Sequence, residues 1–246
     1  MEKVSVSKKF TCYNAGLVEF RDKRMNSFDV IKTPIHKEGH VFIALFFVIS
    51  IIIWAIFGPV AGICGLIVSA WCMYFFRDPE RVIPDDKNIL VSPADGTVCA
   101  IVKAVPPAEL NMGDEERIRI SIFLSVFNVH VNRVPAKGTI TGLSYVHGKF
   151  LDAAATEASE ENERQLVRMT TEDGADIAFA QVAGLVARRI ICNLKEGQEV
   201  DRGDRFGLIR FGSRTDIYLD KSQEAAVKIG QLMIGGETVI ARKSAK

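Results

Sequence analysis

The sequence lacks a strong net charge and any cluster of metal-binding residues. Its formal net charge is +1, so no electrostatic field points to nucleic acid as a partner. The five cysteines form no Cys-x-x-Cys pair, and their odd number supports neither a zinc site nor a disulfide framework. This cysteine usage fits a reducing cytoplasm. Candidate bases are few, because the chain has four histidines: His36, His40, His130 and His147.

Charge is also missing from residues 41–76, a run of 36 residues without a charged side chain. A single membrane span needs only about 20 apolar residues. The run begins some 40 residues into the chain and no small-residue cleavage site follows it, which excludes a secretory signal peptide. Gly58-Pro59 divides it nearly in half, where a helix should break or kink.

Three structures of this run are consistent with its composition: a single kinked span, a hairpin of two short helices, and a buried pair of core helices. Cationic residues flank it on both sides, Lys32 and Lys37 before and Arg77, Arg81 and Lys87 after. Cations at both ends favour a hairpin with both ends in the cytoplasm. We therefore expect an anchor at the cytoplasmic face of the cell membrane. Whether the hairpin dips into the bilayer or crosses it stays open, since halves of about 17 residues are at the short limit.

The distribution of polar and apolar residues predicts three regions: a polar N-terminal tail (1–40), the hydrophobic helical segment (41–76) and a catalytic domain (77–246). From about residue 88 the chain consists of short β-rich runs between turns. They cover residues 89–92, 97–102, 117–124, 129–134, 138–143, 176–182 and 188–192. Residues 150–165, rich in Ala and Glu, are the helical or loop exception. The pattern predicts a mainly β fold, a compact β-sandwich with a minor helix.

The most informative short motif is Arg210-Phe211-Gly212-Ser213-Arg214. In a strained turn the Ser213 hydroxyl could attack the Gly212 carbonyl and convert the amide to an ester. β-Elimination would then cut the chain and leave a pyruvoyl group, an electron sink suited to decarboxylating amino acids. Most Gly-Ser pairs are ordinary turns, so this tripeptide alone is a weak signal.

Six motifs in order make the signal specific. They are Phe76-Arg-Asp-Pro, Ser92-Pro-Ala-Asp-Gly, Ser125-Val-Phe-Asn-Val-His-Val-Asn-Arg, Gly148-Lys-Phe-Leu, Ala158-Ser-Glu-Glu-Asn-Glu-Arg and Arg210-Phe-Gly-Ser-Arg. Together they resemble the short, bacterial-type form of the phosphatidylserine decarboxylase family, over residues 77–242. Two segments, from Ser92 and from Val200, also resemble the hammerhead domains of biotinyl and lipoyl carriers, which indicates a barrel-sandwich-hybrid-like fold rather than a function.

The resemblance implies a self-processing lyase. The proenzyme would cut itself between Gly212 and Ser213, giving a β chain (1–212) and an α chain (213–246) that starts with the pyruvoyl group. A Schiff base between that group and the lipid amine would allow loss of carbon dioxide, turning phosphatidylserine into phosphatidylethanolamine. The pyruvoyl group would be the only cofactor, with no metal, and the membrane lipid and the paired chains would be the partners. A homo-oligomer is also consistent with the sequence.

Ser213 needs a base, because a serine hydroxyl is a weak nucleophile at its free pKa. His130 is the best candidate, since imidazole titrates near neutral pH. It lies in an alternating run, so Asn128, His130 and Asn132 should share one face of a strand and line a pocket. Asp95 by itself is a turn residue. The resemblance places it in an Asp-His-Ser triad that orients the histidine.

One position departs from the family pattern. Longer members carry a second histidine three positions after the first, where this chain has Arg133. His130 would then serve both processing and decarboxylation, with His147 as the lower-ranked alternative for processing. Arg133 would instead bind the substrate phosphate or carboxylate as a bidentate donor.

Three other functions are compatible with parts of the pattern. A decarboxylase of another serine lipid, such as an ether lipid, would use the same headgroup chemistry. A carrier domain would need a lysine at the hairpin tip, where this chain has Gly212-Ser213. A non-catalytic, membrane-anchored hammerhead-like module would leave the Gly-Ser pair and His130 unexplained.

Overall fold

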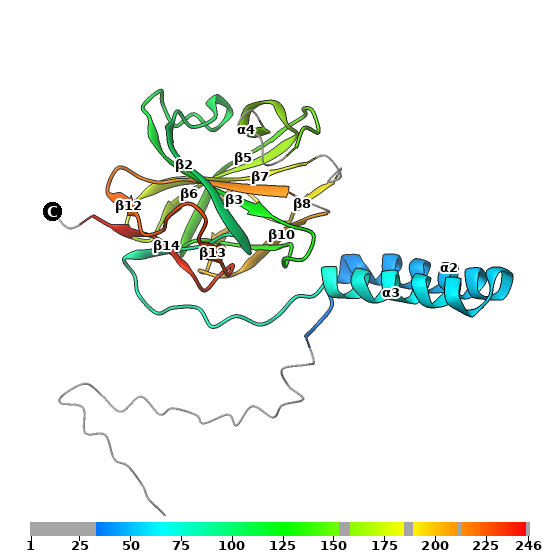
Figure 1. The fold of residues 1–246 in the computed structure, drawn as a ribbon. Coiled ribbons are helices and arrows are strands. Elements are labelled where there is room, and N and C mark those ends of the chain that lie inside the picture. The colour runs from blue at the N-terminus through cyan, green and yellow to red at the C-terminus, as the bar shows by residue number, and fades with distance from the viewer. Residues whose placement is uncertain (1–32, 153–157, 185–188, 211–212, 245–246) are drawn as a thin grey trace, which may run out of the picture. The chain divides into compact units, whose positions relative to one another are not determined.

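The computed structural model describes residues 33–152, 158–184, 189–210 and 213–244. Most of the predicted tail, residues 1–32, and the predicted cleavage-site residue Gly212 lie outside the described residues. The described part contains an N-terminal helical hairpin and a mainly β domain, which confirms the predicted fold class (Figure 1).

The uncharged run forms two helices, α2 (His40–Phe57) and α3 (Pro59–Phe75), preceded by the 3-10 helix η1 (Lys37–Gly39). Gly58 ends α2 with a φ of 85°, a left-handed value that favours glycine. Pro59 then starts α3 at a position where a missing N–H costs nothing. The hairpin prediction is confirmed. A core helix pair is excluded, because α2 buries Ser50 alone.

Small residues let the two helices approach closely. The Ser50 and Ser69 hydroxyls are 3.0 Å apart across the hairpin. A Cβ placed on Gly62 would lie 2.6 Å from the Trp54 side chain, and one on Gly65 would lie 2.8 Å from the Ser50 hydroxyl. Such packing is typical of helices in lipid, where no hydrophobic force drives association. The exposed side chains of the hairpin are large and apolar, including Val41, Leu45, Ile52, Ile56, Phe57, Val60 and Ile67.

Backbone hydrogen bonds tie the two ends of the hairpin together. Ile35 and Arg77 form an antiparallel bridge. The His36 amide donates to the Phe76 carbonyl at 2.8 Å, and the Asp78 amide donates to the Pro34 carbonyl at 2.7 Å. The chain therefore enters and leaves the hairpin on the same side.

The β domain is built from short strands that pair antiparallel throughout. The strands are β1 (Ile89–Val91), β2 (Gly96–Ala104), β3 (Arg117–Leu124), β4 (Val131–Arg133), β5 (Gly138–Val146), β6 (Arg164–Thr171), β7 (Asp176–Val182), β8 (Ile190–Cys192), β9 (Glu199–Val200), β10 (Arg205–Ile209), β11 (Ser213–Tyr218), β12 (Gln223–Ala225), β13 (Leu232–Met233) and β14 (Val239–Lys243). The only other described helices are η2 (Ala108–Leu110) and α4 (Ala158–Glu161).

Three sheets surround one main core. The long sheet has the order β13-β2-β3-β11-β7-β6-β5-β9, and two shorter sheets have the orders β4-β10-β8 and β1-β14-β12. The core draws Ile122 and Phe179 from the long sheet, Phe206 from β10 and Ile240 from β14, all fully buried. Burying such side chains stabilises the fold by about 1.5–3 kcal/mol each. This core fixes how the sheets face one another, and thereby the place of β11.

The seven predicted β-rich runs each contain an observed strand, so that prediction is confirmed. The alternation in β3 matches its place between β2 and β11. Residues 150–165 include α4, as expected, but also the start of β6, which was not predicted. Charged residues at positions 164 and 168 obscured the apolar alternation of that strand.

Candidate active site

Ser213 begins β11, a middle strand of the long sheet. It pairs with Leu124 of β3, and the following residues of β11, 214–218, pair with both β3 and β7. The Ser213 side chain is fully buried, and its hydroxyl has no hydrogen-bond partner within the described part of the chain. A buried hydroxyl left unpaired costs about 1–3 kcal/mol. Because this unpaired hydroxyl destabilises the fold, we infer that Ser213 is present for its chemistry and not for stability.

Two strand pairings lie on either side of residues 210–212 in the sequence. The link from β3 to β4 covers residues 125–130, and the link from β10 to β11 covers residues 210–212. β3 pairs with β11 at Leu124 and Ser213, and β4 pairs with β10 at Val131 and Leu208. Leu208 and Ser213 are therefore each paired to a strand that borders residues 125–130. His130 directly precedes β4, whose partner β10 is the strand before Ser213 along the chain.

His130 lies just before β4 and is fully buried. Its ring packs against Phe75 of α3, with ring centroids 4.1 Å apart. Nδ1 is 3.0 Å from the Asn128 carbonyl oxygen. Because a carbonyl can only accept, Nδ1 carries the proton and Nε2 has the free lone pair. Nε2 is buried and has no partner among the described residues.

The electrostatic surroundings keep His130 uncharged. Burial lowers the pKa of His130 to about 4, and the nearby Arg77 charge acts in the same direction. The imidazole is therefore neutral at pH 7 with Nε2 unprotonated. A neutral ring with a free, oriented lone pair is what a proton acceptor for Ser213 requires.

Asp95 lies in the turn between β1 and β2 and is held by other partners. The Arg81 guanidinium donates to its two carboxylate oxygens at 2.9 and 2.8 Å, and the Gly235 amide donates to one of them at 2.7 Å. Burial raises the pKa of Asp95 above its usual value, although Arg81 opposes the shift. In the uncut chain His130 is therefore oriented by the Asn128 carbonyl rather than by Asp95.

The predicted common face of Asn128, His130 and Asn132 is wrong for Asn128. This residue lies in the turn after β3, where its side-chain oxygen accepts from the Ser125 amide at 2.8 Å and the Ser125 hydroxyl at 2.7 Å. The alternating pattern begins only at β4, because the residues just before it belong to the turn and not to a strand. Asn128 therefore shapes the loop and orients His130 through its carbonyl.

Arg133 is buried and engaged with the segment that follows the hairpin. Its guanidinium donates to the Gly203 carbonyl at 2.9 Å and the Pro79 carbonyl at 2.8 Å, and lies 3.5 Å from the Asp78 carboxylate. Asp78 also pairs with Arg205 at 2.7 Å. In the uncut chain these contacts occupy Arg133, which was predicted as a substrate ligand.

Asn132 lies on β4, and its side-chain oxygen accepts from Gln181 Nε2 at 2.8 Å. Gln181 and Thr215 are functional candidates that sequence reasoning missed. Both are fully buried, and each has an atom without a partner among the described residues, Gln181 Oε1 and Thr215 Oγ1. The one available signal was a lone glutamine in the otherwise apolar run at the end of residues 176–182.

His147 is a surface residue. Its side chain is 87% exposed, and its ring lies 3.7 Å from Glu163. It is neither buried nor on β3, β4 or β11. His130 is therefore the better-placed histidine for Ser213.

The base of the hairpin contacts the loop that carries His130. Phe75 and Phe76 pack with Val129, Val131 and Leu208 in one buried cluster. The Arg77 guanidinium donates to the Phe127 carbonyl at 2.9 Å. The candidate site is thus next to the helices expected to meet lipid.

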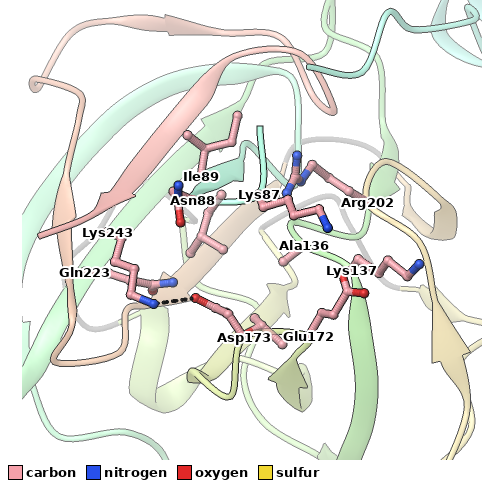
Figure 2. Close-up of a pocket in the computed structure, with 12 residues that line it drawn as sticks. Lys87, Asn88, Ile89, Ala136, Lys137, Glu172, Asp173, Arg202, Gln223 and Lys243 are labelled. Carbon is pink, nitrogen blue, oxygen red and sulfur yellow. Dashed lines mark hydrogen bonds and ion pairs between the residues drawn. The ribbon is translucent and has the colours of Figure 1, made fainter. Parts of the chain in front are cut away.

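The polar cavity shown in Figure 2 lies elsewhere. It has a volume of about 310 Å³, and its lining includes Lys87, Lys137, Arg202 and the ion pair Lys243–Asp173 at 3.2 Å. None of the sequence-predicted site residues lines it.

Comparison with known proteins identifies relatives over most of the chain. The family described as "Phosphatidylserine decarboxylase" matches residues 68–241. A "Phosphatidylserine decarboxylase proenzyme" of Rickettsia bellii is 52% identical over 217 residues, covering 88% of this chain and 94% of the relative. The protein of the same name from Paramagnetospirillum magneticum is 53% identical over 208 residues, covering 85% of this chain and 86% of the relative.

Proposed function

Because the chain belongs to the phosphatidylserine decarboxylase family, we propose that it converts phosphatidylserine to phosphatidylethanolamine with a pyruvoyl group made from Ser213. The observation that carries the assignment to Ser213 is its hydroxyl at the start of β11, which is buried and has no partner among the residues that the structure describes. The diacyl or ether linkage of the lipid is remote from this chemistry, which takes place at the headgroup.

Self-cleavage uses groups of the chain itself. His130 Nε2 accepts the Ser213 hydroxyl proton while the oxygen attacks the Gly212 carbonyl carbon. The peptide C–N bond breaks, its nitrogen takes up a proton, and an ester remains. Removal of the Ser213 α-proton then expels the carboxylate of residues 1–212, and water replaces the nitrogen of the resulting dehydroalanine, releasing ammonia.

The polar side chains around residue 213 are suited to a pyruvoyl group at that position. Ser213 and Thr215 each carry a buried hydroxyl without a partner in the described ranges, and both face the same side of β11. The pyruvoyl ketone supplies an electron sink when it condenses with the headgroup amine. His130 can hold or return a proton through Nε2, and Asn132 offers a buried N–H donor.

The membrane assignment rests on the hairpin. Helix 37–57 is the only described helix long and apolar enough to span a bilayer. At 17 residues α3 is about 25 Å long, shorter than the roughly 30 Å hydrocarbon core. Both ends emerge together beside cationic Lys37, Arg77 and Arg81. This supports a hairpin held in the membrane from the cytoplasmic face.

A charge on the exposed apolar surface of the hairpin is expected to weaken membrane binding. In the double variant Ile52→Glu, Ile56→Glu, two carboxylates would enter lipid at a cost of a few kcal/mol each. The wild type should stay in the pellet after carbonate washing, and the variant should be partly released. Val82→Glu is the matched control, because Val82 is exposed outside the hairpin.

The membrane face can be read from the same preparations. A C-terminal epitope tag should be digested by protease in inverted vesicles and protected in intact spheroplasts. Digestion in spheroplasts, or release of the wild type by carbonate, would contradict the assignment.

The electron sink is expected to be trapped on the smaller chain. Incubation with phosphatidylserine and cyanoborohydride should add a lipid mass to the 34-residue chain 213–246 and none to chain 1–212. Hydroxylamine should inactivate the enzyme by capturing the same ketone. Lipid mass on the larger chain, or full activity after hydroxylamine, would refute the pyruvoyl assignment.

A further inference from the structure

We propose that Thr215 and Asn132 bind the carboxylate of the serine headgroup and that Gln181 positions Asn132, an inference that rests on the decarboxylase function above. These three residues, with Ser213 and His130, are called the polar cluster. All five are fully buried. Each has a side-chain nitrogen or oxygen with no partner in the part of the chain that the structure describes.

The strand register places Thr215 beside Ser213. Alternate residues of a strand share a face, so Ser213, Thr215 and Ile217 point the same way. Ile217 belongs to the core between the sheets, whereas Tyr218 packs in a separate cluster on the other side. The Thr215 hydroxyl therefore faces inward on the same side as the residue that becomes the pyruvoyl group.

Gln181 joins the two sheets at this point. It is directly opposite Thr215 in the pairing of β11 with β7, where facing Cβ atoms lie about 4.5–5.5 Å apart. Its side chain reaches the opposite sheet, where Nε2 donates to Asn132 at 2.8 Å and to the Ile191 carbonyl at 3.2 Å. Gly207 leaves room for it, since a Cβ there would lie 2.9 Å from Gln181 Nε2.

The hydrogen-bond pattern fixes the orientation of both amides. The Ile191 carbonyl can only accept, so the atom facing it must be the Gln181 nitrogen. The Asn132 atom that accepts from that nitrogen must be oxygen, so the Asn132 amide nitrogen is a donor with no partner among the described residues. Gln181 thus holds Asn132 with its N–H groups available.

These hydrogen-bond donors are uncharged, which suits a carboxylate that is lost as carbon dioxide. The Asn132 amide and the Thr215 hydroxyl are neutral donors, and the nearby Arg133 is occupied by Asp78, Pro79 and Gly203. A carboxylate held by neutral donors in a buried site is less stabilised than one in water or one paired with a cation. When the bond between its carbon and the α-carbon breaks, the electron pair passes to the electron sink and carbon dioxide leaves uncharged.

The test compares a substrate that has the carboxylate with a product that lacks it. Thr215→Val removes the hydroxyl and keeps the shape. Per mole of processed 34-residue chain, its kcat/KM for phosphatidylserine should fall about 10- to 100-fold, the usual effect of losing a hydrogen bond to a charged group. Cyanoborohydride trapping of phosphatidylethanolamine, which has the amine alone, should proceed at the wild-type rate. Thr215→Ser should restore decarboxylation.

Two further variants complete the design. Gln181→Met, similar in shape but unable to hold Asn132, should reproduce the selective loss. Thr139→Val is the matched control, because Thr139 lies on β5, outside the polar cluster, and should behave as wild type. Unchanged decarboxylation, an equal loss of phosphatidylethanolamine trapping, or failure of both Thr215→Val and Gln181→Met to process would overturn the carboxylate site. Absence of trapping in the wild type would instead overturn the pyruvoyl function.

Discussion

Replacing Ser213 with alanine is expected to leave the chain whole, at 27.2 kDa, and to abolish decarboxylation. The variant has no hydroxyl to attack the preceding carbonyl, and therefore no route to the ketone. Wild-type protein should give two chains, 1–212 and 213–246, in a denaturing gel with intact-mass measurement. The smaller chain should resist sequential degradation, since its N-terminus would be a keto group instead of an amine.

The structure indicates that Ser213→Ala removes the reactive hydroxyl without disturbing the fold. The Ser213 hydroxyl is buried and unpartnered among the described residues, so its removal breaks no observed hydrogen bond. Removing such a group is neutral or stabilising, and the variant should unfold at a temperature no lower than that of the processed wild type. An active wild-type preparation consisting of one intact chain would refute self-processing, and so would cleavage of the alanine variant at the same bond.

The second large effect is expected from His130→Asn. The asparagine amide can take the place of Nδ1 and donate to the Asn128 carbonyl, but it offers nothing where Nε2 stands. Loss of a general base usually slows a reaction about 10²- to 10⁴-fold, and self-cleavage should slow by that factor. The measurement is the fraction of cut chain against time after synthesis.

His147→Asn is the matched control for this variant. The His147 side chain is 87% exposed, so the same substitution there should leave cleavage at the wild-type rate. Thermal unfolding should confirm that both variants are folded. Normal cleavage of His130→Asn with lost decarboxylation would assign His130 to the lipid step alone. Slow cleavage of His147→Asn would transfer the processing role to that residue.

The β domain was predictable because its strands carry their signal locally. The run 117–122 alternates polar and apolar residues, and the structure places it in β3, where residues 119–124 pair with β11. The hairpin was predictable from Gly58-Pro59 together with cations at both ends. Neither conclusion required knowledge of distant contacts.

The partners of the site residues were not predictable, since they come from distant parts of the chain. Asp95 bonds to Arg81 and Gly235, and Gln181 meets Asn132 across two sheets. Periodicity assigns a residue to a face of its own strand and says nothing about what lies opposite. Asn128 shows the limit even locally, because a turn of a few residues interrupts the alternating run in which it lies.

Arg133 departs from the pattern of the longer family members, and its contacts in the structure are those of a packing residue. At the position where longer members have a second histidine, this chain places a guanidinium that binds the Asp78-Pro79 segment below the hairpin. Arg133 thereby links the segment after the hairpin to β4, one residue from Asn132 and three from His130. The substitution is therefore well placed to hold the site against the hairpin.

The position of β11 determines how the cut protein must be assembled. The strand that would begin the small chain lies between β3 and β7, and β13 and β14 of the same chain pair with β2 and β1. Breaking one peptide bond leaves all these pairings in place, so the two products remain one folded body. Folding of the precursor is unimolecular, whereas refolding of the separated chains would be bimolecular and would depend on concentration. Synthesis as a single chain is thus what allows a 34-residue piece to occupy the middle of a sheet.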